Sequence, residues 1–380
     1  MNMDYLIIGA GFAGSVMAER LASRCDKKVH IIEKRPHIGG NCYDEVDSSG
    51  VLVHRYGPHL FHTENRVVYE YLSGFTQWHN YRHKVVAHVD GRNIAIPFSF
   101  TTLYQVFDDV KADVLKAKLI ERYGEGNKVS VLELREAEDE ELKALGEYVY
   151  EKIFVHYTAK QWGIPASEVN PAVLARVPVL TSYDTHYFQD TYQAVPQSGY
   201  TRLFETLLDH PNISIALGED ALETLKIIDK QLYYEGERFE GTVIFTGMLD
   251  ALFDHCYGVL PYRSLDLRFE VCDQEYYQDN AVVNYPNEHE YTRITEFKHI
   301  HPVKSPQATI LKEYPQNYIN GKNIPYYPMP TEDSKEQYER YAALAQEIDN
   351  LVLLGRLAEY RYYDMDDIVA RALDVFEELT

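Results

Sequence analysis

A chain of 380 residues is too long for one ordinary hydrophobic core, so we expect two or three packed units. With 45% hydrophobic and 25% charged residues the composition is that of a soluble globular protein, and no apolar run reaches the roughly 18 residues of a membrane span. The net charge of −22 argues against a nucleic-acid surface, which needs basic patches, but leaves room for an anionic small molecule held by a few arginines.

The N-terminus and the cysteines indicate the compartment. The chain opens with "MNMDYLIIGAG", which enters a strand-like run directly and lacks the layout of a signal peptide. The four cysteines, Cys25, Cys42, Cys256 and Cys272, are widely spaced and form neither a CxxC pair nor a zinc-ligand pattern. We therefore expect a cytoplasmic protein without a disulfide framework or a metal site.

The first predicted elements form a dinucleotide-binding turn. In "DYLIIGAGFAGSVMAERLA" an apolar strand leads into an alanine-rich helix through Gly9, Gly11 and Gly14, which make G-x-G-x-x-G. These glycines permit a tight turn, the approach of a pyrophosphate and close helix packing, with the phosphates at the helix N-terminus. The second strand, "KVHIIEKR", ends in Glu33, at the usual distance for binding a ribose hydroxyl. The alternative is an ordinary βαβ turn.

A second glycine pair distinguishes an FAD-binding domain from an NAD-binding domain. Gly39 and Gly40 follow the acidic residue at once, whereas an NAD domain normally continues into a helix there. This arrangement resembles flavoproteins of the glutathione-reductase and amine-oxidase type and implies FAD rather than nicotinamide. No second G-x-G-x-x-G appears downstream, so we expect no built-in NADPH domain.

The middle of the chain predicts helices first and strands later. Residues 101–146 predict charged helices, and "HYTAKQWGIP" follows where a helix gives way to a loop. Residues 215–300 alternate apolar and polar side chains and predict antiparallel strands, while "GTVIFTG" (241–247) predicts a strand that returns to the dinucleotide sheet. The C-terminal stretch predicts a strand, a loop and an amphipathic helix, with Asp364 or Asp366 at its start.

Six segments together resemble the UDP-galactopyranose mutase family. They are "GPHLFHT", "YTAKQWG", "LARVPV", "YTRITE", "KEYP" and "GRLAEYRYYDMD", in the family's order and at its spacings, and the resemblance covers essentially the whole chain. It implies an α/β fold, in which a Rossmann-like FAD-binding domain carries an inserted helical domain and an antiparallel β-sheet domain. The implied bounds are 1–80, 193–250 and 340–380 for the discontinuous FAD domain, 98–165 for the helical substrate cap, and 81–97, 166–192 and 251–339 for the sheet domain.

The resemblance also implies a substrate pocket. Trp162 would pack against the sugar, with a plug between domains as its alternative, and Tyr157 would pack against the base. Arg176 and Arg293 would neutralise two phosphates, because guanidinium groups match phosphate oxygens and stay charged. These arginines and His59 are the implied catalytic residues. The other implied substrate-binding residues are Phe154, Thr158, Tyr187, Asn284, Tyr314, Tyr362 and Asp364.

The implied cofactor site gathers the glycine turns and the ends of the Rossmann strands. His59 and His62, in "GPHLFHT", would lie beside the flavin ring, and for His62 a structural hydrogen bond is an equal alternative. The implied FAD-binding residues are Gly9, Gly11, Phe12, Ala13, Gly14, Glu33, Lys34, Gly40, Asn41, His59, Gly247, Gly355, Arg356, Tyr362, Asp364 and Met365.

The implied reaction moves no net electrons, which explains the missing hydride supplier. In this family reduced FAD acts as a nucleophile: its ring nitrogen attacks the anomeric carbon, UDP leaves, the sugar ring opens and recloses through another hydroxyl, and UDP returns. The resemblance thus implies conversion of UDP-galactopyranose to UDP-galactofuranose for surface polysaccharides, an external reductant and a homodimer.

Four positions depart from bacterial members of the family. Ile153 stands where a Phe is common, His83 where an Asn is common, Leu180 where an Arg is frequent, and Phe297 where a His is usual. These changes keep open another nucleotide sugar, such as UDP-N-acetylgalactosamine or a 6-deoxy sugar. A flavin oxidase of the amine-oxidase type and a sugar-nucleotide sensor without turnover are the competing functions.

Overall fold

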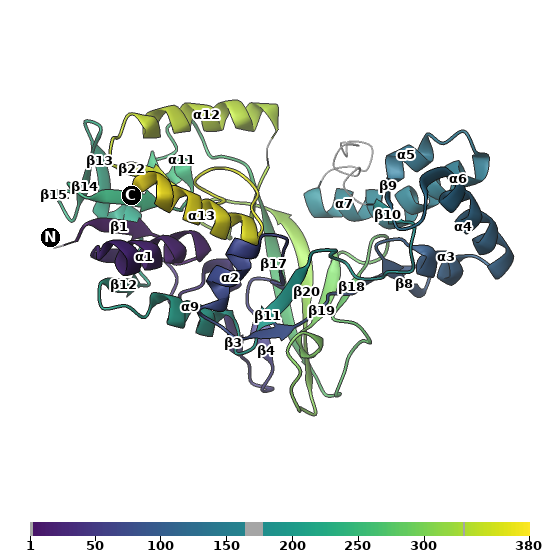
Figure 1. The fold of residues 1–380 in the computed structure, drawn as a ribbon. Helices are drawn as coiled ribbons and strands as arrows, with labels where there is room; N and C mark the ends of the chain where they lie inside the picture. The colour runs from purple at the N-terminus through teal and green to yellow at the C-terminus, as the bar shows by residue number, and fades with distance from the viewer. Residues whose placement is uncertain (1–2, 164–177, 330) are drawn as a thin grey trace.

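The computed structural model describes residues 3–163, 178–329 and 331–380. A Rossmann body, which contains both chain ends, lies on the left of Figure 1, a helical body lies on the right, and a large sheet runs between them. The predicted α/β class with a Rossmann-like domain, a helical insertion and a second sheet is confirmed.

The Rossmann body is built on a five-stranded sheet in the order β12-β2-β1-β16-β22, and all its neighbouring pairs are parallel. Its strands are β12 (Ile213–Leu217), β2 (Val29–Glu33), β1 (Tyr5–Ile8), β16 (Thr242–Phe245) and β22 (Leu351–Leu353). Strand β16 thus returns to lie beside β1, as the sequence predicts. Alternate residues of β1 enter two different cores, so both faces of the sheet are covered, as parallel sheets require.

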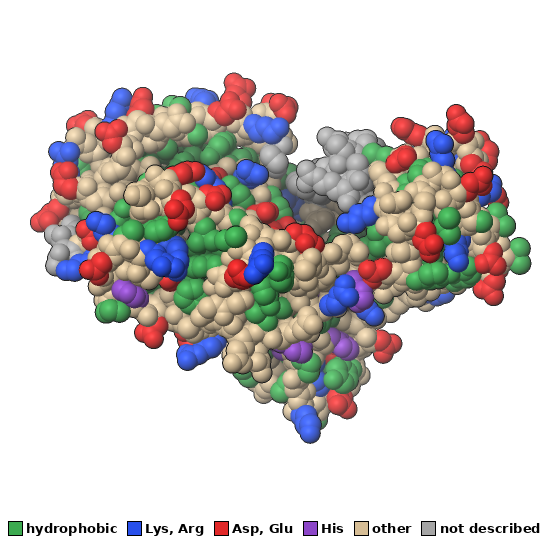
Figure 2. Space-filling view, viewed as in Figure 1, with side chains coloured by type: hydrophobic (Ala, Val, Ile, Leu, Met, Phe, Trp, Pro, Cys, Tyr) green, Lys and Arg blue, Asp and Glu red, His purple; other side chains and the backbone are tan. Residues whose placement is uncertain are grey.

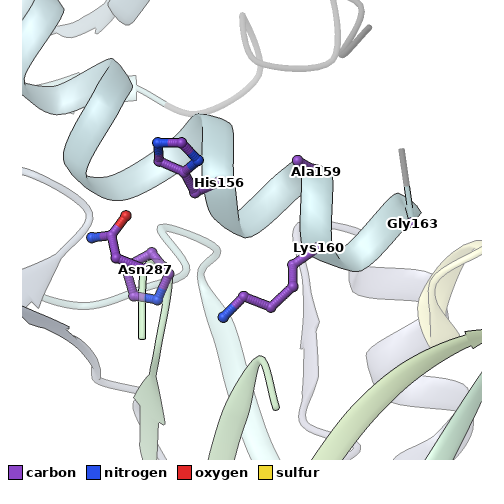
Figure 3. A pocket seen from close by; sticks show the side chains of 6 residues that line it. His156, Ala159, Lys160, Gly163 and Asn287 are labelled. Carbon is purple, nitrogen blue, oxygen red and sulfur yellow. The ribbon is translucent and has the colours of Figure 1, made fainter. Parts of the chain in front are cut away.

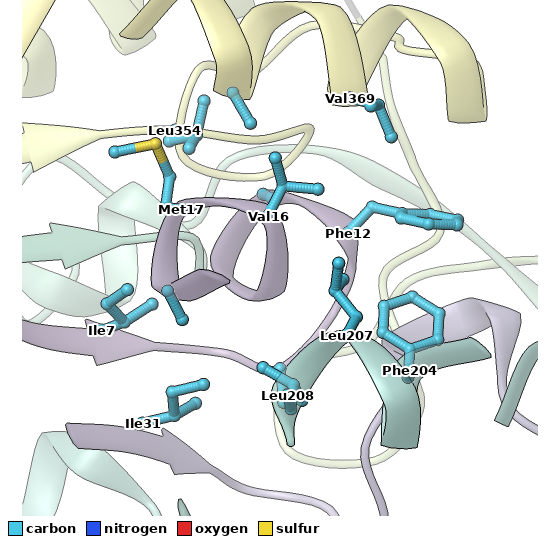
Figure 4. Close-up of a cluster of buried hydrophobic side chains, with 14 of the residues drawn as sticks. Ile7, Phe12, Val16, Met17, Ile31, Phe204, Leu207, Leu208, Leu354 and Val369 are labelled. Carbon is cyan, nitrogen blue, oxygen red and sulfur yellow. The ribbon is translucent and has the colours of Figure 1, made fainter. Parts of the chain in front are cut away.

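Helix α1 (Phe12–Cys25) is buried along most of its length between other helices. It packs against α13 (Met365–Leu379) and α9 (Tyr200–Leu208), and Figure 4 shows Phe12 and Val16 meeting Phe204, Leu207 and Val369 there. This packing holds the N-terminus of α1 rigidly at the carboxyl end of β1, where the glycine turn lies.

The second sheet has seven strands in the order β21-β17-β20-β19-β18-β7-β8. They are β21 (Tyr327–Pro328), β17 (Tyr262–Cys272), β20 (Ala308–Asn317), β19 (Arg293–Glu296), β18 (Val282–Asn284), β7 (Val85–Val89) and β8 (Arg92–Ile96). The sequence predicts an antiparallel sheet, but the pair β18–β7 is parallel. The cause is topological: the helical body separates β7 from β18 in the chain, and long connections permit parallel neighbours.

The helical body packs on β7 and β8 and shares their hydrophobic core. It consists of α3 (Phe100–Val106), α4 (Asp109–Tyr123), α5 (Val131–Arg135), α6 (Glu140–Val149), a π-helical turn (Tyr150–Phe154) and α7 (Val155–Trp162). The acidic run predicted to be a solvated face opens α6, where Asp139 caps the helix and pairs with Lys118 at 2.6 Å. Acidic side chains at a helix N-terminus also stabilise the helix, because they interact favourably with the positive end of its dipole.

Further strands and helices make up the rest of the described ranges. The remaining strands are β3 (Asp44–Val46), β4 (Leu52–His54), β5 (Phe61–Thr63), β6 (Trp78–Asn80), β9 (Lys128–Ser130), β10 (Pro178–Leu180), β11 (Tyr192–Pro196), β13 (Leu225–Ile228), β14 (Gln231–Tyr234) and β15 (Glu237–Arg238). The remaining helices are α2 (Arg66–Ser73), α10 (Ala221–Thr224), α11 (Leu249–Leu252) and α12 (Glu332–Gln346). Within the described ranges, no helix combines the length and apolar character needed to cross a bilayer.

Candidate active site

The surface is hollowed between the Rossmann body and the helical body (Figure 2). Side chains from the large sheet, from α7 and from the loop before α13 meet around one arginine, Arg293. Among the described residues, no group of three His, Cys, Asp or Glu side chains is placed to hold a metal ion.

Arg293 and Glu313 form the charged centre of this site. Arg293 on β19 lies directly opposite Glu313 on β20 and opposite Asn284 on β18, so the three residues make one row across the sheet. The Arg293 Nε donates to Glu313 Oε1 at 2.6 Å, and the Glu313 side chain is only 3% exposed. Although burial opposes the charge, the Glu313 carboxylate holds the pKa of Arg293 above its ordinary value. The site therefore contains a permanent cation.

Tyr157 and Tyr187 face this cation from two other segments. Burial raises the pKa of the Tyr157 phenol on α7, and the positive charge of Arg293 opposes that rise only in part. Burial also raises the pKa of Tyr187, which is anchored by its backbone N–H to the carbonyl of His83 at 2.8 Å. Both phenols therefore stay protonated at neutral pH and can donate hydrogen bonds to an anionic oxygen.

The prediction for Tyr314 is wrong, because strand register turns it away. Neighbouring residues of a strand point to opposite faces, and Glu313 faces Arg293. Tyr314 instead packs beneath the guanidinium of Arg268, 4.0 Å from the ring centroid, and edge-on to Tyr291.

Tyr327 occupies the site instead and was missed. It lies near both Arg293 and Tyr157, its ring centroid lies 6.0 Å from that of Tyr362, and the Arg356 guanidinium lies 5.3 Å from its ring. It falls in "NIPYYPMP", outside the six family segments, and the tyrosine pair between prolines was the available signal.

The loop before α13 carries Tyr362 and Asp364, the last two residues predicted to bind the substrate. The Tyr362 hydroxyl donates to Asp364 Oδ1 at 2.8 Å, and Asp364 is also the N-cap of α13. Asp366 accepts a hydrogen bond from Thr63 Oγ1 at 2.7 Å. Arg356 donates to the carbonyls of Tyr326 and Tyr363 and lies over the Tyr362 ring at 4.9 Å. The capping prediction therefore holds for Asp364, whose oxygens serve two partners.

The glycine turns fit a dinucleotide pyrophosphate. Gly9 has φ +106° at the turn after β1, and a Cβ on Gly40 would lie 2.9 Å from the Gly11 Cα, so two glycine backbones meet at the start of α1. Gly11 is the N-cap of α1 and supplies no side-chain cap, which leaves the first N–H groups free for phosphate oxygens. A Cβ on Gly355 would lie 3.4 Å from the Cβ of Ala13, at the same edge of the sheet.

Glu33 and Arg35 fit the adenosine side of FAD. Glu33 accepts the backbone N–H groups of Ala10 and Arg35, both at 2.8 Å, which fixes its carboxylate at the end of β2 with lone pairs left for ribose hydroxyls. Arg35 donates to Asn41 Oδ1 at 2.9 Å and stacks over Tyr56 at 4.1 Å. Its buried Nη1 has no hydrogen-bond partner among the described residues, as expected where a ligand acceptor belongs. Arg35 was not predicted from the sequence.

Four further residues predicted to bind the cofactor have other contacts in the structure. The Lys34 side chain is 76% exposed, and its ammonium group pairs with Asp220 at 2.6 Å. The prediction that Lys34 binds the cofactor is therefore wrong for its side chain. The Phe12 ring packs on Phe204 in the core, so only the backbone N–H of Phe12 can contact the cofactor. A Cβ on Gly247 would meet the Phe245 ring at 2.9 Å, and this packing explains the glycine. Met365 is the first residue of α13 and is half-buried against the core.

His59 lies near Arg293 and Arg356, and burial lowers its pKa to about 4, so it is neutral at pH 7. Its backbone N–H donates to His54 Nδ1 at 3.0 Å, and His54 Nε2 lies 3.0 Å from His301 Nε2. Because His54 accepts at Nδ1, its proton lies on Nε2 and points to His301. His62 pairs with Asp190 at 3.1 Å, which is the structural alternative foreseen for it.

Among the other residues predicted to bind the substrate, two have described side chains and two do not. Thr158 is buried on α7, and Phe154 belongs to the core of the helical body with 6% exposure, which makes its ring a packing residue. Trp162 ends α7, but its side chain lies outside the described part of the structure. Arg176 falls in 164–177, also outside the described residues.

Comparison with known families and proteins gives a consistent result. The family model described as UDP-galactopyranose mutase matches residues 152–362, and the model described as an NAD(P)-binding Rossmann-like domain matches residues 7–75. The chain is 37% identical to a probable UDP-galactopyranose mutase of Klebsiella pneumoniae, covering 99% of this chain and 94% of that one. It is 35% identical to a dTDP-fucopyranose mutase of Escherichia coli, covering 97% and 96%.

Solved structures agree in fold. A crystal structure of reduced UDP-galactopyranose mutase matches with a TM-score of 0.73 and 15% identity, covering 100% of this chain and 94% of that one. Putrescine oxidase matches with a TM-score of 0.56 and 12% identity, covering 100% and 99%, so the competing oxidase class shares the fold. The family match covers more than half of the chain, and relatives above 30% identity cover nearly all of it. The chain belongs to the UDP-galactopyranose mutase family, and FAD is its cofactor.

Proposed function

We propose that the protein interconverts UDP-galactopyranose and UDP-galactofuranose, with FAD in its reduced form. The observation that carries this proposal is the charged centre, in which the permanent cation Arg293 stands beside the protonated phenols of Tyr157 and Tyr187. Reduced FAD supplies the nucleophile for exchange at the anomeric carbon. The protein then has to hold a nucleoside diphosphate that departs, waits and returns.

The described side chains suit that task. When the bond to the anomeric carbon breaks, negative charge grows on the diphosphate, and Arg293 with the Tyr157, Tyr187 and Tyr327 hydroxyls can stabilise it. Glu313 orients the guanidinium through Nε, which leaves the Nη groups for phosphate oxygens. Because no proton has to leave Arg293, binding and release of the diphosphate cost no change of protonation there.

A second candidate is the same chemistry on a dTDP-linked 6-deoxy sugar. It is favoured by the 35% identity to a dTDP-fucopyranose mutase, which nearly equals the 37% identity to the UDP-galactopyranose mutase relative. The departures at Ile153 and His83 are compatible with either base. His83 is buried beside Tyr187 and Phe188, and burial lowers its pKa to about 3, so a neutral ring faces the site.

The two candidates are separated by one assay. The protein is reduced with dithionite and incubated with UDP-galactose and, separately, with dTDP-fucose, and the nucleotide sugars are separated by chromatography. A furanose product from UDP-galactose at the higher kcat/KM supports the proposal. A higher kcat/KM on dTDP-fucose supports the second candidate, and turnover of neither overturns both.

We further propose the setting of this reaction. The chain would divide into a discontinuous FAD domain, a helical cap and a sheet domain, with β10 assigned to the helical cap and not to the sheet domain, because it pairs with β9. The enzyme would act as a cytoplasmic homodimer that supplies galactofuranose for surface polysaccharides. An external reductant charges the flavin, because the sequence has a single G-x-G-x-x-G turn. Sedimentation of the holoenzyme tests the dimer.

A further inference from the structure

Lys160, in the middle of "YTAKQWG", has no part in the chemistry described so far, yet it is surrounded by backbone carbonyls. Its ammonium Nζ lies 2.6 Å from the carbonyl oxygen of Tyr285, 3.2 Å from that of Glu288 and 3.0 Å from that of His289. The carbonyl of Tyr291 is a fourth acceptor at 3.4 Å. An ammonium group has three protons, so the loop supplies more acceptors than Lys160 has donors.

These carbonyls belong to one loop, 285–291, which joins β18 to β19. The loop is shaped by its own side chains: His289 has φ +64°, its ring stacks on Tyr291 at 4.7 Å, and Tyr285 is edge-on to both rings. Lys160 points from α7 into a pocket of about 560 Å³ toward the loop that carries Asn287 (Figure 3). Because the carbonyls occupy its N–H groups, Lys160 fastens the loop and does not offer that pocket a free cation.

The hydrogen bonds between Lys160 and the 285–291 loop lie between two parts of the active site. The 285–291 loop follows Asn284 and leads into Arg293, while Tyr157 precedes Lys160 on α7 by about one helical turn. Lys160 is half-buried, and even partial removal of an ammonium group from water is costly unless hydrogen bonds compensate, as the four carbonyls do here.

A second cation fastens the same end of α7. Arg263 on β17 is 4% exposed and donates through Nε to the carbonyl of Gln161 at 3.2 Å, and it also donates to Asn317. The C-terminal carbonyls of a helix carry partial negative charge, which Arg263 neutralises. Gly163 ends the helix with φ +65°, and a Cβ there would lie 2.7 Å from Arg263 Nη1.

We propose that Lys160 is a positioning residue that fixes α7 on the 285–291 loop and thereby sets the spacing between Tyr157 and Arg293 around the diphosphate. This inference rests on the proposed function for the identity of the ligand. Arg263 supports the arrangement by holding the end of α7 to the sheet. Loss of the Lys160 ammonium group lets the loop and the helix separate, and the two diphosphate contacts no longer act together.

The test uses the FAD-loaded protein and free UDP as the probe, with binding measured by calorimetry. Lys160→Met removes the charge and keeps the stem, Lys160→Arg restores a cation, and Lys152→Met is the control because Lys152 makes an exposed ion pair with Asp90 in the same body. We expect Lys160→Met to weaken UDP about tenfold, equivalent to roughly 1.4 kcal/mol. We expect Lys160→Arg to recover most of this affinity, and Lys152→Met to stay within about twofold of the wild type.

A double-mutant cycle separates positioning from a general loss of stability. In a Tyr157→Phe background one of the two contacts is already gone, so Lys160→Met should weaken UDP by much less than in the wild type. Equal effects in both backgrounds, or an unchanged UDP affinity for Lys160→Met, would overturn the proposal.

Hydrogen exchange tests the contact between Lys160 and the 285–291 loop independently of the proposed function. If the wild type binds neither UDP nor dTDP, the proposed function fails, and the fastening is then judged on exchange alone. Lys160→Met should increase exchange of the backbone amides in 285–291 and in α7, whereas Lys152→Met should not. Unchanged exchange in Lys160→Met would contradict the fastening whatever the ligand.

The pH profile gives an independent readout. Burial lowers the pKa of Lys160 to about 8, opposed by Glu288, so a proton leaves Lys160 in the mildly alkaline range. Among the described residues, the other titratable side chains around Lys160 include those of His156 on α7, of Tyr285, Glu288, His289 and Tyr291 in the loop, and of His88, which pairs with Glu288 at 3.5 Å. UDP affinity should therefore fall between about pH 7 and 9 in the wild type, and it should fall less in Lys160→Arg, whose guanidinium stays charged. Parallel profiles would count against the proposal.

Discussion

Removal of Arg293 should abolish most turnover, but the structure shows that the simple variant is a poor test. The Glu313 carboxylate opposite it is 3% exposed, and deleting one partner of a buried ion pair costs about 3–5 kcal/mol of stability. Arg293→Ala alone therefore risks unfolding for a reason unrelated to catalysis. The informative variant is Arg293→Met combined with Glu313→Gln, which removes both charges and keeps the shape of the pair.

The magnitude follows from the bonds that Arg293 can make. Its two Nη groups can each donate a charge-assisted hydrogen bond worth about 1.5–3 kcal/mol to the leaving diphosphate, and the more strongly charged transition state gains more from them. Losing about 3 kcal/mol of transition-state stabilisation lowers kcat/KM roughly 150-fold. Glu313→Gln alone keeps the cation, so it should lose less than about tenfold.

The assay follows furanose formation by the dithionite-reduced holoenzyme with UDP-galactose, while absorbance measures FAD content and thermal unfolding reports stability. We expect the double variant to retain FAD and to lose at least about a hundredfold in kcat/KM. If the double variant holds FAD and turns over within tenfold of the wild type, Arg293 does not stabilise the diphosphate.

Further predictions follow from individual side chains. Tyr327→Phe should weaken UDP binding by roughly tenfold, whereas Tyr314→Phe should leave it unchanged, because only Tyr327 faces the site; calorimetry compares the two. Arg35→Met should release FAD on gel filtration while helix content by circular dichroism stays constant. If Trp162 packs on the sugar, Trp162→Ala should weaken UDP-galactose more than UDP in paired titrations. Burial lowers the pKa of His301 to about 4, so below about pH 6.5 the unfolded chain binds the proton first, and His301 alone should lower the free energy of unfolding by about 2 kcal/mol between pH 7.5 and 5. In urea titrations His301→Gln should show a smaller drop.

The Rossmann body and its cofactor turn were predictable because local sequence encodes them. Gly9 and Gly40 occupy positions with positive φ, and "GTVIFTG" has the apolar run of a buried strand. The parallel pairing of β18 with β7 was not predictable, because it depends on which strand the helical body brings alongside. Alternation in a strand shows that two faces exist, but it does not show which face meets the ligand.

The site residues illustrate the same limit. Arg293 was found through a family segment, whereas Tyr314 was assigned to the wrong face by one residue of register, next to Glu313. Tyr327 and Arg35 were missed because each acquires its role only when distant segments meet. Tyr327 reaches Tyr362 across the loop before α13, and Arg35 has a buried nitrogen whose lack of a protein partner appears only in three dimensions.

The most direct test of the central claim compares oxidised with reduced enzyme on one nucleotide sugar. We predict no furanose product from the oxidised protein, and many turnovers for each reduction by dithionite, because no electrons leave with the product. Cyanoborohydride added during turnover should trap a species whose mass is the sum of FAD and the sugar. Full activity with oxidised flavin, or one reducing equivalent consumed for each product formed, would contradict the assignment as a flavin-dependent mutase.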